Sequence, residues 1–350
     1  MPKIALVYGT RPEAIKMGPV AHELAMLRAD VVICCTGQHT DLLRGSPAEK
    51  DLTNSTNLGI ASDGSVPRFL TRATTEVERW LRKQAPDIVV VQGDTMSAMA
   101  GARAATNLDL ALAHIEAGVR THNLEEPYPE EMLRVEIDGL ADRCYAPTEH
   151  ARANLLEEGI PYGNIRVTGN TVVSAIKRYT KAKPLSEPED LILITLHRRE
   201  LRMRGKATQV IQALYDNIAL YPNIAFLWPV HPAMAGYFPS TAFPPNLALS
   251  SPFPYRQAVE RLATARGVIT DSGGITEEAA TLGVPTIILR NVNDRPEAVH
   301  AGVALLRPPS PAGVAEAIDA LVRQTLPRVA TNVFGNASAA KTVATLLAST

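Results

Sequence analysis

The chain has 350 residues, of which 46% are hydrophobic and 20% are charged, and its formal net charge is −1. Such a length exceeds one ordinary hydrophobic core and predicts two domains of roughly 150–180 residues each. The charge balance gives no general attraction to nucleic acid or to a membrane surface, so neither partner is expected and any anion must be bound by local groups.

The cysteines and the first residues of the chain indicate the cellular compartment of the protein. The three cysteines are an odd number without CxxC spacing, which argues against a disulfide framework or a zinc site. Met1–Lys3 leads directly into a short apolar run, which is too short for a signal peptide or a membrane span. We therefore expect a cytoplasmic protein.

Short β-rich runs alternate with helix-length amphipathic stretches, which is typical of parallel sheets covered by helices. The predicted strands of the first half are Ile4–Tyr8, Val31–Cys35, Ile88–Val91, Leu110–His114, Cys144–Ala146 and Ile165–Val167. Those of the second half are Leu191–Leu196, Ala225–Pro229, Gly267–Thr270, Thr286–Leu289 and Ala304–Leu306. The polar, proline-containing segment Lys181–Asp190 is typical of a linker. The prediction is an α/β protein made of two Rossmann-like units with a cleft between them.

Ligand sites of such sheets gather at the carboxyl ends of the strands, so the residues after each strand are informative. After the first strand, Pro12 suits the first helical position and Glu13 the first turn. The helix is expected to bury an apolar stripe of Ala14, Met17, Ala21 and Leu24. Arg11 stands beside free helix-start amides and can meet phosphate or sugar oxygens. The alternative is an ordinary strand–helix turn with a solvent-exposed arginine.

Asp94 ends the strand Ile88–Val91 in the sequence Gln92-Gly93-Asp94-Thr95, where the glycine leaves it open to the expected cleft. It is a candidate base or orienting carboxylate. It is equally compatible with a helix N-cap, because a helix is expected from Met96 onwards.

The segment His114–Arg134 collects carboxylates and guanidiniums on a stretch broken by glycine and proline after a strand. Its charged members are Glu116, Arg120, Glu130, Glu131 and Arg134. Such a set suits a polyanionic ligand whose reacting carbon loses and regains a proton. Together with Asp94, two of these carboxylates would raise one another's pKa, as general acids and bases require. A solvated charged connector is the other interpretation.

In the second half, His197 and two arginines follow the strand Leu191–Leu196. A histidine there can bind or protonate a phosphate oxygen, unless it only bonds to backbone. His231 has a weaker context, and a structural role is favoured for it.

The strongest anion-binding signal is the sequence Asp271-Ser272-Gly273-Gly274 at the start of an expected helix. Glycines there expose helix-start amides and Ser272 adds a hydroxyl, which indicates a diphosphate cradle rather than a plain turn. Glu278 or Glu277, one turn further, can accept the hydroxyls of a ribose. Residues after the next strand, Arg290, Arg295 and Glu297, either complete the pocket or pair with each other. No dinucleotide-binding glycine fingerprint and no P-loop motif occurs.

Nine motifs resemble, in one order along nearly the whole chain, those of the non-hydrolysing UDP-N-acetylglucosamine 2-epimerases. They are GTRPEAIKM at Gly9–Met17, QGDT at Gln92–Thr95, EAGVRT at Glu116–Thr121, PEE at Pro129–Glu131, TGNTV at Thr168–Val172, HRRE at His197–Glu200, PVH at Pro229–His231, TDSGG at Thr270–Gly274 and RPEAV at Arg295–Val299. The resemblance implies the GT-B architecture. It places a first domain at 1–170, a UDP-binding domain at 171–335, and a final segment at 336–350 whose helix, roughly Ala337–Leu347, crosses back to the first domain.

The resemblance further implies interconversion of UDP-N-acetylglucosamine and UDP-N-acetylmannosamine, with no nicotinamide, no other cofactor and no metal, in a homodimer. The family eliminates UDP to form 2-acetamidoglucal and adds it back with C2 inverted. Matched motif by motif, the acid–base carboxylates are Asp94, Glu116 and Glu130, and His197 steadies the departing UDP. Arg11, Ser272, Gly273, Gly274 and Glu278 become UDP ligands, and Lys16, Arg134 and Arg295 become phosphate or carboxylate partners.

Three alternatives remain open at this stage. A hydrolysing epimerase would release free N-acetylmannosamine and UDP, although its relatives usually differ at Pro12–Met17. A GT-B glycosyltransferase would need an acceptor site that the sequence does not indicate. A nucleotide-sugar-binding protein without turnover would have no need of all four candidate catalytic residues.

Three stretches near the expected site depart from the family pattern. They are Leu42–Pro47, Glu125-Glu126 and Leu201–Met203. The first falls where bacterial members bind an activating second molecule of substrate, so the resemblance does not carry that activation over to this chain.

Overall fold

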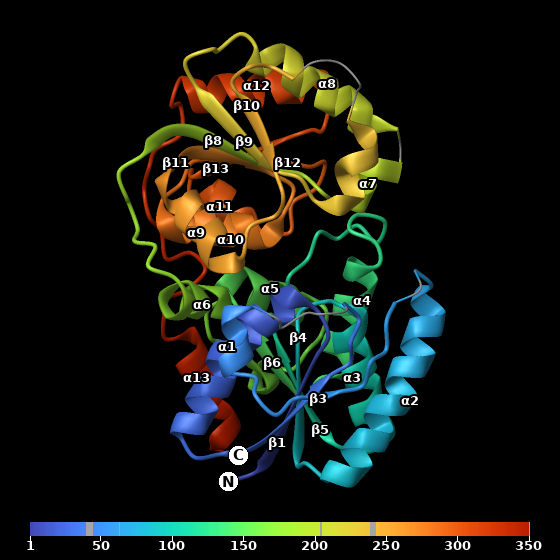
Figure 1. The fold of residues 1–350 in the computed structure, drawn as a ribbon. Helices are drawn as coiled ribbons and strands as arrows, with labels where there is room; N and C mark the ends of the chain where they lie inside the picture. The colour runs from blue at the N-terminus through green and yellow to red at the C-terminus, as the bar shows by residue number, and fades with distance from the viewer. Residues whose placement is uncertain (40–44, 63, 204, 239–242, 350) are drawn as a thin grey trace. The chain divides into compact units, whose positions relative to one another are not determined.

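The computed structural model describes residues 1–39, 45–62, 64–203, 205–238 and 243–349 (Figure 1). The chain forms two compact units: Met1–Tyr179 with Phe334–Thr350, and Thr180–Val333. The contact boundary lies at Tyr179 rather than near residue 170, because helix α6 (Thr171–Tyr179) packs on α1 (Arg11–Met26) of the first unit. Part of the divergent stretch at 42–47 lies outside the described residues.

The described part of the first unit contains a seven-stranded parallel sheet in the order β3-β2-β1-β4-β5-β6-β7. Its strands are β1 Lys3–Tyr8, β2 Asp30–Cys35, β3 Thr56–Asn57, β4 Ile88–Gln92, β5 Ala111–Ile115, β6 Arg143–Ala146 and β7 Ile165–Val167. Its other helical elements are η1 Pro47–Lys50, α2 Val66–Gln84, α3 Met96–Asn107, α4 Glu130–Leu140, α5 Glu149–Glu157, η2 Tyr162–Asn164 and α13 Ala339–Ala348. Helices α1, α6 and α13 form one packed group, and α2, α3 and α4 form another.

Helix α1 follows the predicted pattern. Thr10 and Glu13 form a reciprocal capping box, and a proline occupies the first turn. The four residues of the predicted apolar stripe are all at most 5% exposed. The final helix α13 packs on α1 and α6, and Ser174 of α6 fixes its start by donating to the Ala337 carbonyl and accepting from the Ala340 amide, both at 3.0 Å. The C-terminal helix is thus part of the first compact unit.

The described part of the second unit contains a six-stranded parallel sheet in the order β10-β9-β8-β11-β12-β13. Its strands are β8 Glu189–Thr195, β9 Ala225–Pro229, β10 Leu247–Ser250, β11 Ala265–Thr270, β12 Thr286–Leu289 and β13 Ala304–Arg307. Its helical elements are α7 Arg199–Met203, α8 Lys206–Ile218, η3 Pro232–Tyr237, α9 Tyr255–Thr264, α10 Gly273–Leu282, α11 Pro296–His300 and α12 Pro311–Val322.

All eleven predicted strands are present, with ends that shift by a residue or two. The sequence did not predict the edge strands β3 and β10, because both are short. Strand β3 consists of two exposed residues, and β10 is four residues long. The three cysteines are buried and free. Among the described residues, no helix combines the length and apolar character needed to cross a bilayer.

Candidate functional site

In the first unit, Asp94 follows β4 and pairs with Arg134 of α4. The Arg134 guanidinium is 3% exposed, and it also donates to Glu131 at 3.2 Å. The N-cap of α3 is Thr95, whose hydroxyl accepts from the Ala98 amide at 2.9 Å, so the N-cap interpretation of Asp94 is wrong. The Asp94 carboxylate, 26% exposed, is therefore available for chemistry at the end of the strand.

Glu116 occupies the equivalent place after the neighbouring strand β5. Its backbone φ is +70°, in the left-handed region that non-glycine residues rarely adopt. The carboxylate accepts from Lys16 Nζ at 2.5 Å and from Gln92 Nε2 at 2.6 Å. The structure thus brings Lys16 of α1 to Glu116, and the buried cation offsets a buried carboxylate charge.

Glu130 and Glu131 open α4 but have different surroundings. Glu131 is buried and accepts from the amides of Thr121 and His122 at 2.8 Å each. It therefore closes the turn ahead of the helix, which fixes the position of its half-buried neighbour Glu130. Arg120 binds Glu158 and Asp138 at 2.7 Å each, so its role is structural.

The turn after β1 contains an unexpected buried carboxylate. Glu13 is 1% exposed and accepts from the Gly9 amide at 3.0 Å, the Thr10 amide at 2.7 Å and the Thr95 hydroxyl at 2.8 Å. Burial raises the pKa of Glu13 from 4.5 to about 7 despite these donors. Glu13 thereby ties the turn after β1 to the turn that carries Asp94, while Arg11 at the start of α1 is exposed.

In the second unit, Asp271 organises the end of β8. Its carboxylate accepts from the amides of His197 and Arg198 at 2.8 Å each, and it lies 3.3 Å from His197 Nδ1. The imidazole therefore faces a carboxylate rather than backbone, and its side chain is 39% exposed. It stacks on His231, which caps η3 through Nδ1 as the favoured structural interpretation requires.

The glycine turn begins α10, with Ser272 at the N-cap. Among the described residues, the Ser272 hydroxyl makes no capping hydrogen bond to this helix. Arg295 binds Glu277 at 2.6 Å and Asp294 at 3.0 Å, and its guanidinium carbon would lie 3.2 Å from a Cβ added to Gly273. Glu277 is engaged with Arg295, and Glu278, the ribose ligand that the resemblance implies, is also buried in α10.

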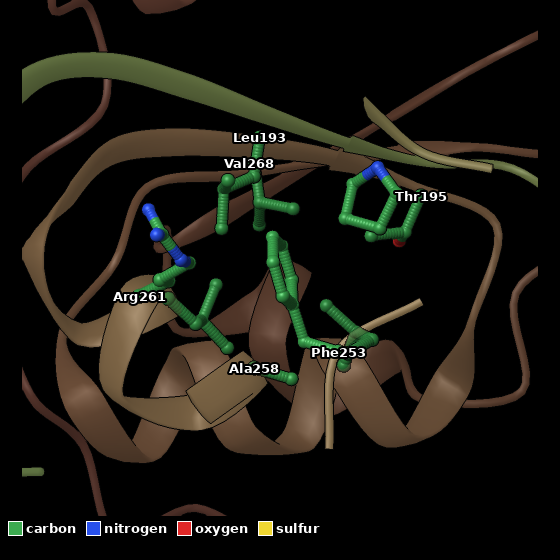
Figure 2. A pocket seen from close by; sticks show the side chains of 9 residues that line it. Leu193, Thr195, Phe253, Ala258, Arg261 and Val268 are labelled. Atoms are coloured by element: carbon green, nitrogen blue, oxygen red, sulfur yellow. The ribbon is translucent and has the colours of Figure 1, made fainter. Parts of the chain in front are cut away.

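Next to this turn lies a small apolar pocket that the sequence did not reveal (Figure 2). It is lined by Leu193, Thr195, Pro229, Phe253, Ala258, Arg261, Leu262, Val268 and Ile275. The Arg261 guanidinium lies 4.9 Å from the Phe253 ring centroid. Thr195 ends β8 and Ile275 belongs to the first turn of α10, so the pocket adjoins both His197 and the glycine turn. Its mainly apolar lining, which includes the Phe253 ring, suits a nucleobase.

A family model described as UDP-N-acetylglucosamine 2-epimerase matches residues 23–348. The UDP-N-acetylglucosamine 2-epimerase of Methanocaldococcus jannaschii is 32% identical, and the alignment covers 99% of this chain and 98% of that protein. The Yersinia pestis protein of the same name is 33% identical over 330 residues, covering 87% of this chain and 86% of that protein. This chain belongs to the UDP-N-acetylglucosamine 2-epimerase family.

Solved structures of UDP-N-acetylglucosamine 2-epimerases share the fold. The Neisseria meningitidis epimerase bound to UDP-GlcNAc has a TM-score of 0.89 and 30% identity, covering 99% of this chain and 100% of that chain. The Methanocaldococcus jannaschii epimerase in complex with UDP-GlcNAc and UDP has a TM-score of 0.90 and 31% identity, with the same coverage. The two parallel sheets with flanking helices thus form the GT-B fold of these epimerases.

In this UDP-N-acetylglucosamine 2-epimerase family member, the candidate residues form two sets. The first unit holds Arg11, Lys16, Asp94, Glu116, Glu130 and Arg134, and the second holds His197, Ser272, Gly273, Gly274, Glu278 and Arg295. Direct contacts join Lys16 to Glu116 and Arg134 to Asp94. Among the described residues, no group of three or more His, Cys, Asp or Glu side chains is arranged to hold a metal ion.

Proposed function

We propose that this chain interconverts UDP-N-acetylglucosamine and UDP-N-acetylmannosamine by inverting C2 of the sugar. One observation carries the proposal: Asp94 and Glu116 follow two hydrogen-bonded neighbouring strands, β4 and β5, and each is paired with a buried cation. Two carboxylates in such places can serve the two faces of one carbon.

The proposed reaction begins when a carboxylate removes the C2 proton while the bond from C1 to the diphosphate oxygen breaks. The electron pair of the C–H bond becomes the C1–C2 double bond of 2-acetamidoglucal, and UDP leaves with the pair of the C–O bond. The reverse addition, with a proton delivered to the other face of C2, gives the epimer. Because that proton is weakly acidic, its base must be placed closely, and Lys16 and Arg134 hold the carboxylates for this purpose.

The second unit is assigned to the leaving group. The helix-start amides of Gly273 and Gly274 and the Ser272 hydroxyl receive the diphosphate, while the Ser272 amide is already bonded to the Thr270 hydroxyl at 3.0 Å. Glu278 receives the ribose hydroxyls. With Nδ1 turned to Asp271, the Nε2 nitrogen of His197 is left to contact the departing UDP. The uracil ring enters the neighbouring apolar pocket, and Arg11 and Arg295 complete the polar partners of the substrate.

We further propose a cytoplasmic homodimer. Cys34, Cys35 and Cys144 remain free thiols, as a reducing compartment favours. Met132 and Val135, three residues apart on α4, are each 38% exposed, and Tyr128 just before the helix is 44% exposed. Exposed apolar side chains on one helix face suit contact with a second copy. Sedimentation of the wild-type protein and of a Met132→Glu variant tests the dimer.

Incubation of the purified protein with UDP-N-acetylglucosamine in deuterated water, followed by proton NMR of the sugar C2 position, tests the reaction. Formation of UDP-N-acetylmannosamine with deuterium at C2 is the expected result. Release of free N-acetylmannosamine and UDP would indicate the hydrolysing reaction instead. An unchanged spectrum together with measurable UDP binding would indicate a binding protein.

A further inference from the structure

Behind the carboxylates of the first unit lies a fully buried histidine–aspartate pair. His114 of β5 and Asp138 of α4 both have 0% exposed side chains. His114 Nδ1 lies 2.6 Å from Asp138 Oδ1, and His114 Nε2 lies 2.8 Å from the Gly93 carbonyl oxygen. Neither residue belongs to the set that the proposed reaction uses.

The partners of the imidazole determine how many protons the pair holds. A carbonyl oxygen only accepts, so Nε2 carries a proton. The short contact between Nδ1 and Oδ1 needs a second proton between them, whichever of the two atoms holds it. The pair therefore binds one proton more than a neutral histidine beside an ionised aspartate, and its net charge is zero.

The other Asp138 oxygen is already occupied by donors. It accepts from the Gly118 amide at 2.9 Å and from Arg120 Nη2 at 2.7 Å, and Arg120 also binds Glu158 at 2.7 Å. Burial alone would raise the pKa of the Asp138 carboxyl, but His114, Arg120 and the Gly118 amide together hold it below its usual value. The proton shared by His114 Nδ1 and the Asp138 carboxyl is thus associated mainly with His114. Glu158, Arg120, Asp138 and His114 then form a row in which negative and positive groups alternate.

The pair connects three segments that carry the candidate catalytic groups. The Gly93 carbonyl directly precedes Asp94, and the Gly118 amide lies two residues after Glu116. Asp138 itself lies one turn after Arg134, the partner of Asp94. The Gly118 segment has little freedom, because a Cβ at this position would lie 2.1 Å from the Ala151 carbonyl oxygen.

We propose that His114 and Asp138 are positioning residues for the epimerisation, which set the separation of Asp94 and Glu116 through the two turns that they bind. The inference rests on the proposed function. It assigns to a strand histidine the task of holding the two acid–base groups at a spacing that matches the two faces of one carbon. A displacement on the order of 1 Å at such groups costs about 100-fold in rate.

Two substitutions separate the two bonds of the imidazole. In His114→Gln the amide nitrogen takes the place of Nε2 and keeps the donor to the Gly93 carbonyl. In His114→Asn the amide nitrogen takes the place of Nδ1 and keeps only the contact with Asp138. We expect kcat to fall about tenfold for His114→Gln and about 100-fold for His114→Asn, with KM and the Kd of UDP changed less than about threefold in both. Asp138→Asn, which keeps the shape of the side chain, serves where His114→Asn does not fold.

The control is Ser174→Ala, which removes a hydroxyl that holds the start of α13 in the same unit. It is expected to lower Tm while leaving kcat unchanged. Nitrogen NMR of the wild-type histidines gives a second readout, since the partners of His114 require a proton on Nε2 and a second one shared between Nδ1 and Asp138.

A folded His114→Asn or Asp138→Asn variant with kcat within threefold of wild type would overturn the positioning role, as would a loss confined to KM. A wild-type protein that binds UDP and turns nothing over would instead overturn the proposed function.

Discussion

The two units build their parts of the site from different materials. In the first, the candidate groups are charged side chains held by opposite charges, such as Lys16 with Glu116 and Arg134 with Asp94. In the second, they are the amides of a glycine turn, a half-exposed histidine and an apolar pocket. Both sets lie at the carboxyl ends of parallel strands. The sheet therefore determines where the groups lie, but not which kind of group is used there.

The difference indicates a division of work. Proton transfer needs side chains whose ionisation and spacing are set by buried partners, whereas capture of a diphosphate and a base needs donors and surface of the right shape. Substitutions of the paired carboxylates in the first unit should therefore reduce turnover, and those in the glycine turn of the second unit should reduce affinity for UDP.

The sharpest test of this division is the removal of charge at the carboxylates. Asp94→Asn and Glu116→Gln are each expected to lower kcat about 1,000-fold, because acid–base groups contribute on the order of 10²–10⁴-fold. The Kd of UDP, measured by calorimetry, should change less than about threefold. Glu76→Gln, on the exposed face of α2, is the matched control. An equal loss of UDP affinity and turnover would contradict the division.

Glu13 is an exception to the contrast between the two units. It is a carboxylate of the first unit, but its partners are backbone amides and a hydroxyl rather than a cation. Its pKa is raised from 4.5 to about 7, so its stabilising contribution is fully present below pH 4.5 and is lost as pH rises through about 7. The free energy of unfolding of wild type relative to Glu13→Gln should therefore fall by on the order of 3 kcal/mol over this range. Urea titrations at a series of pH values measure it, and a difference independent of pH would refute the assignment.

The glycine turn can be tested with one methyl group. The nearest described atom to a Cβ added at Gly274 is Ser272 Oγ, at 4.0 Å, so Gly274→Ala should leave Tm unchanged. Because the methyl group would enter the space of the diphosphate, the affinity for UDP should fall about tenfold. Gly139→Ala is the control, since no described heavy atom lies within 4 Å of its added Cβ. Unchanged UDP affinity for Gly274→Ala would place the diphosphate elsewhere.

The smallest effect is expected for an exposed ion pair on the helix that carries Arg134. Arg103 of α3 binds Glu136 of α4 at 2.6 Å, with side chains 39% and 37% exposed. Arg103→Ala should cost less than about 1 kcal/mol of unfolding free energy, even less at high salt, and should leave kcat unchanged. A loss of activity comparable to that of Arg134→Ala would mean that α4 is placed by its surface contacts.

The sequence was sufficient for the elements and for the strand ends that carry chemistry. Alternation of β-rich runs and amphipathic helices located every strand longer than four residues, and Asp94, Glu116 and His197 were found because they follow strands. The pairing of these groups was not accessible to physical reasoning from sequence, since Lys16 and Glu116 lie 100 residues apart. The resemblance to a family suggested the role of Lys16, and only the fold shows its partner.

The groups that were missed share a physical reason. Asp271 was seen only as part of a glycine turn, although it binds the amides of His197 and Arg198. His114 looked like the last residue of an ordinary strand, because nothing in a sequence says that a polar side chain in a strand is fully buried. Glu13 had a recognisable signal in the Thr-x-x-Glu capping box, but the capping box gives no hint of its bond to Thr95.

The return of α13 to α1 and α6 has a consequence for synthesis on the ribosome. The polypeptide leaves the first unit at Tyr179 and re-enters it at Phe334, so the second unit is the contiguous one. It can fold as soon as it has emerged, whereas the earlier-made first unit keeps the surface for Val343 and Leu347 uncovered until α13 has been made as well. The first unit thus begins to be translated first but completes its fold last. It is also the unit that holds the candidate catalytic carboxylates.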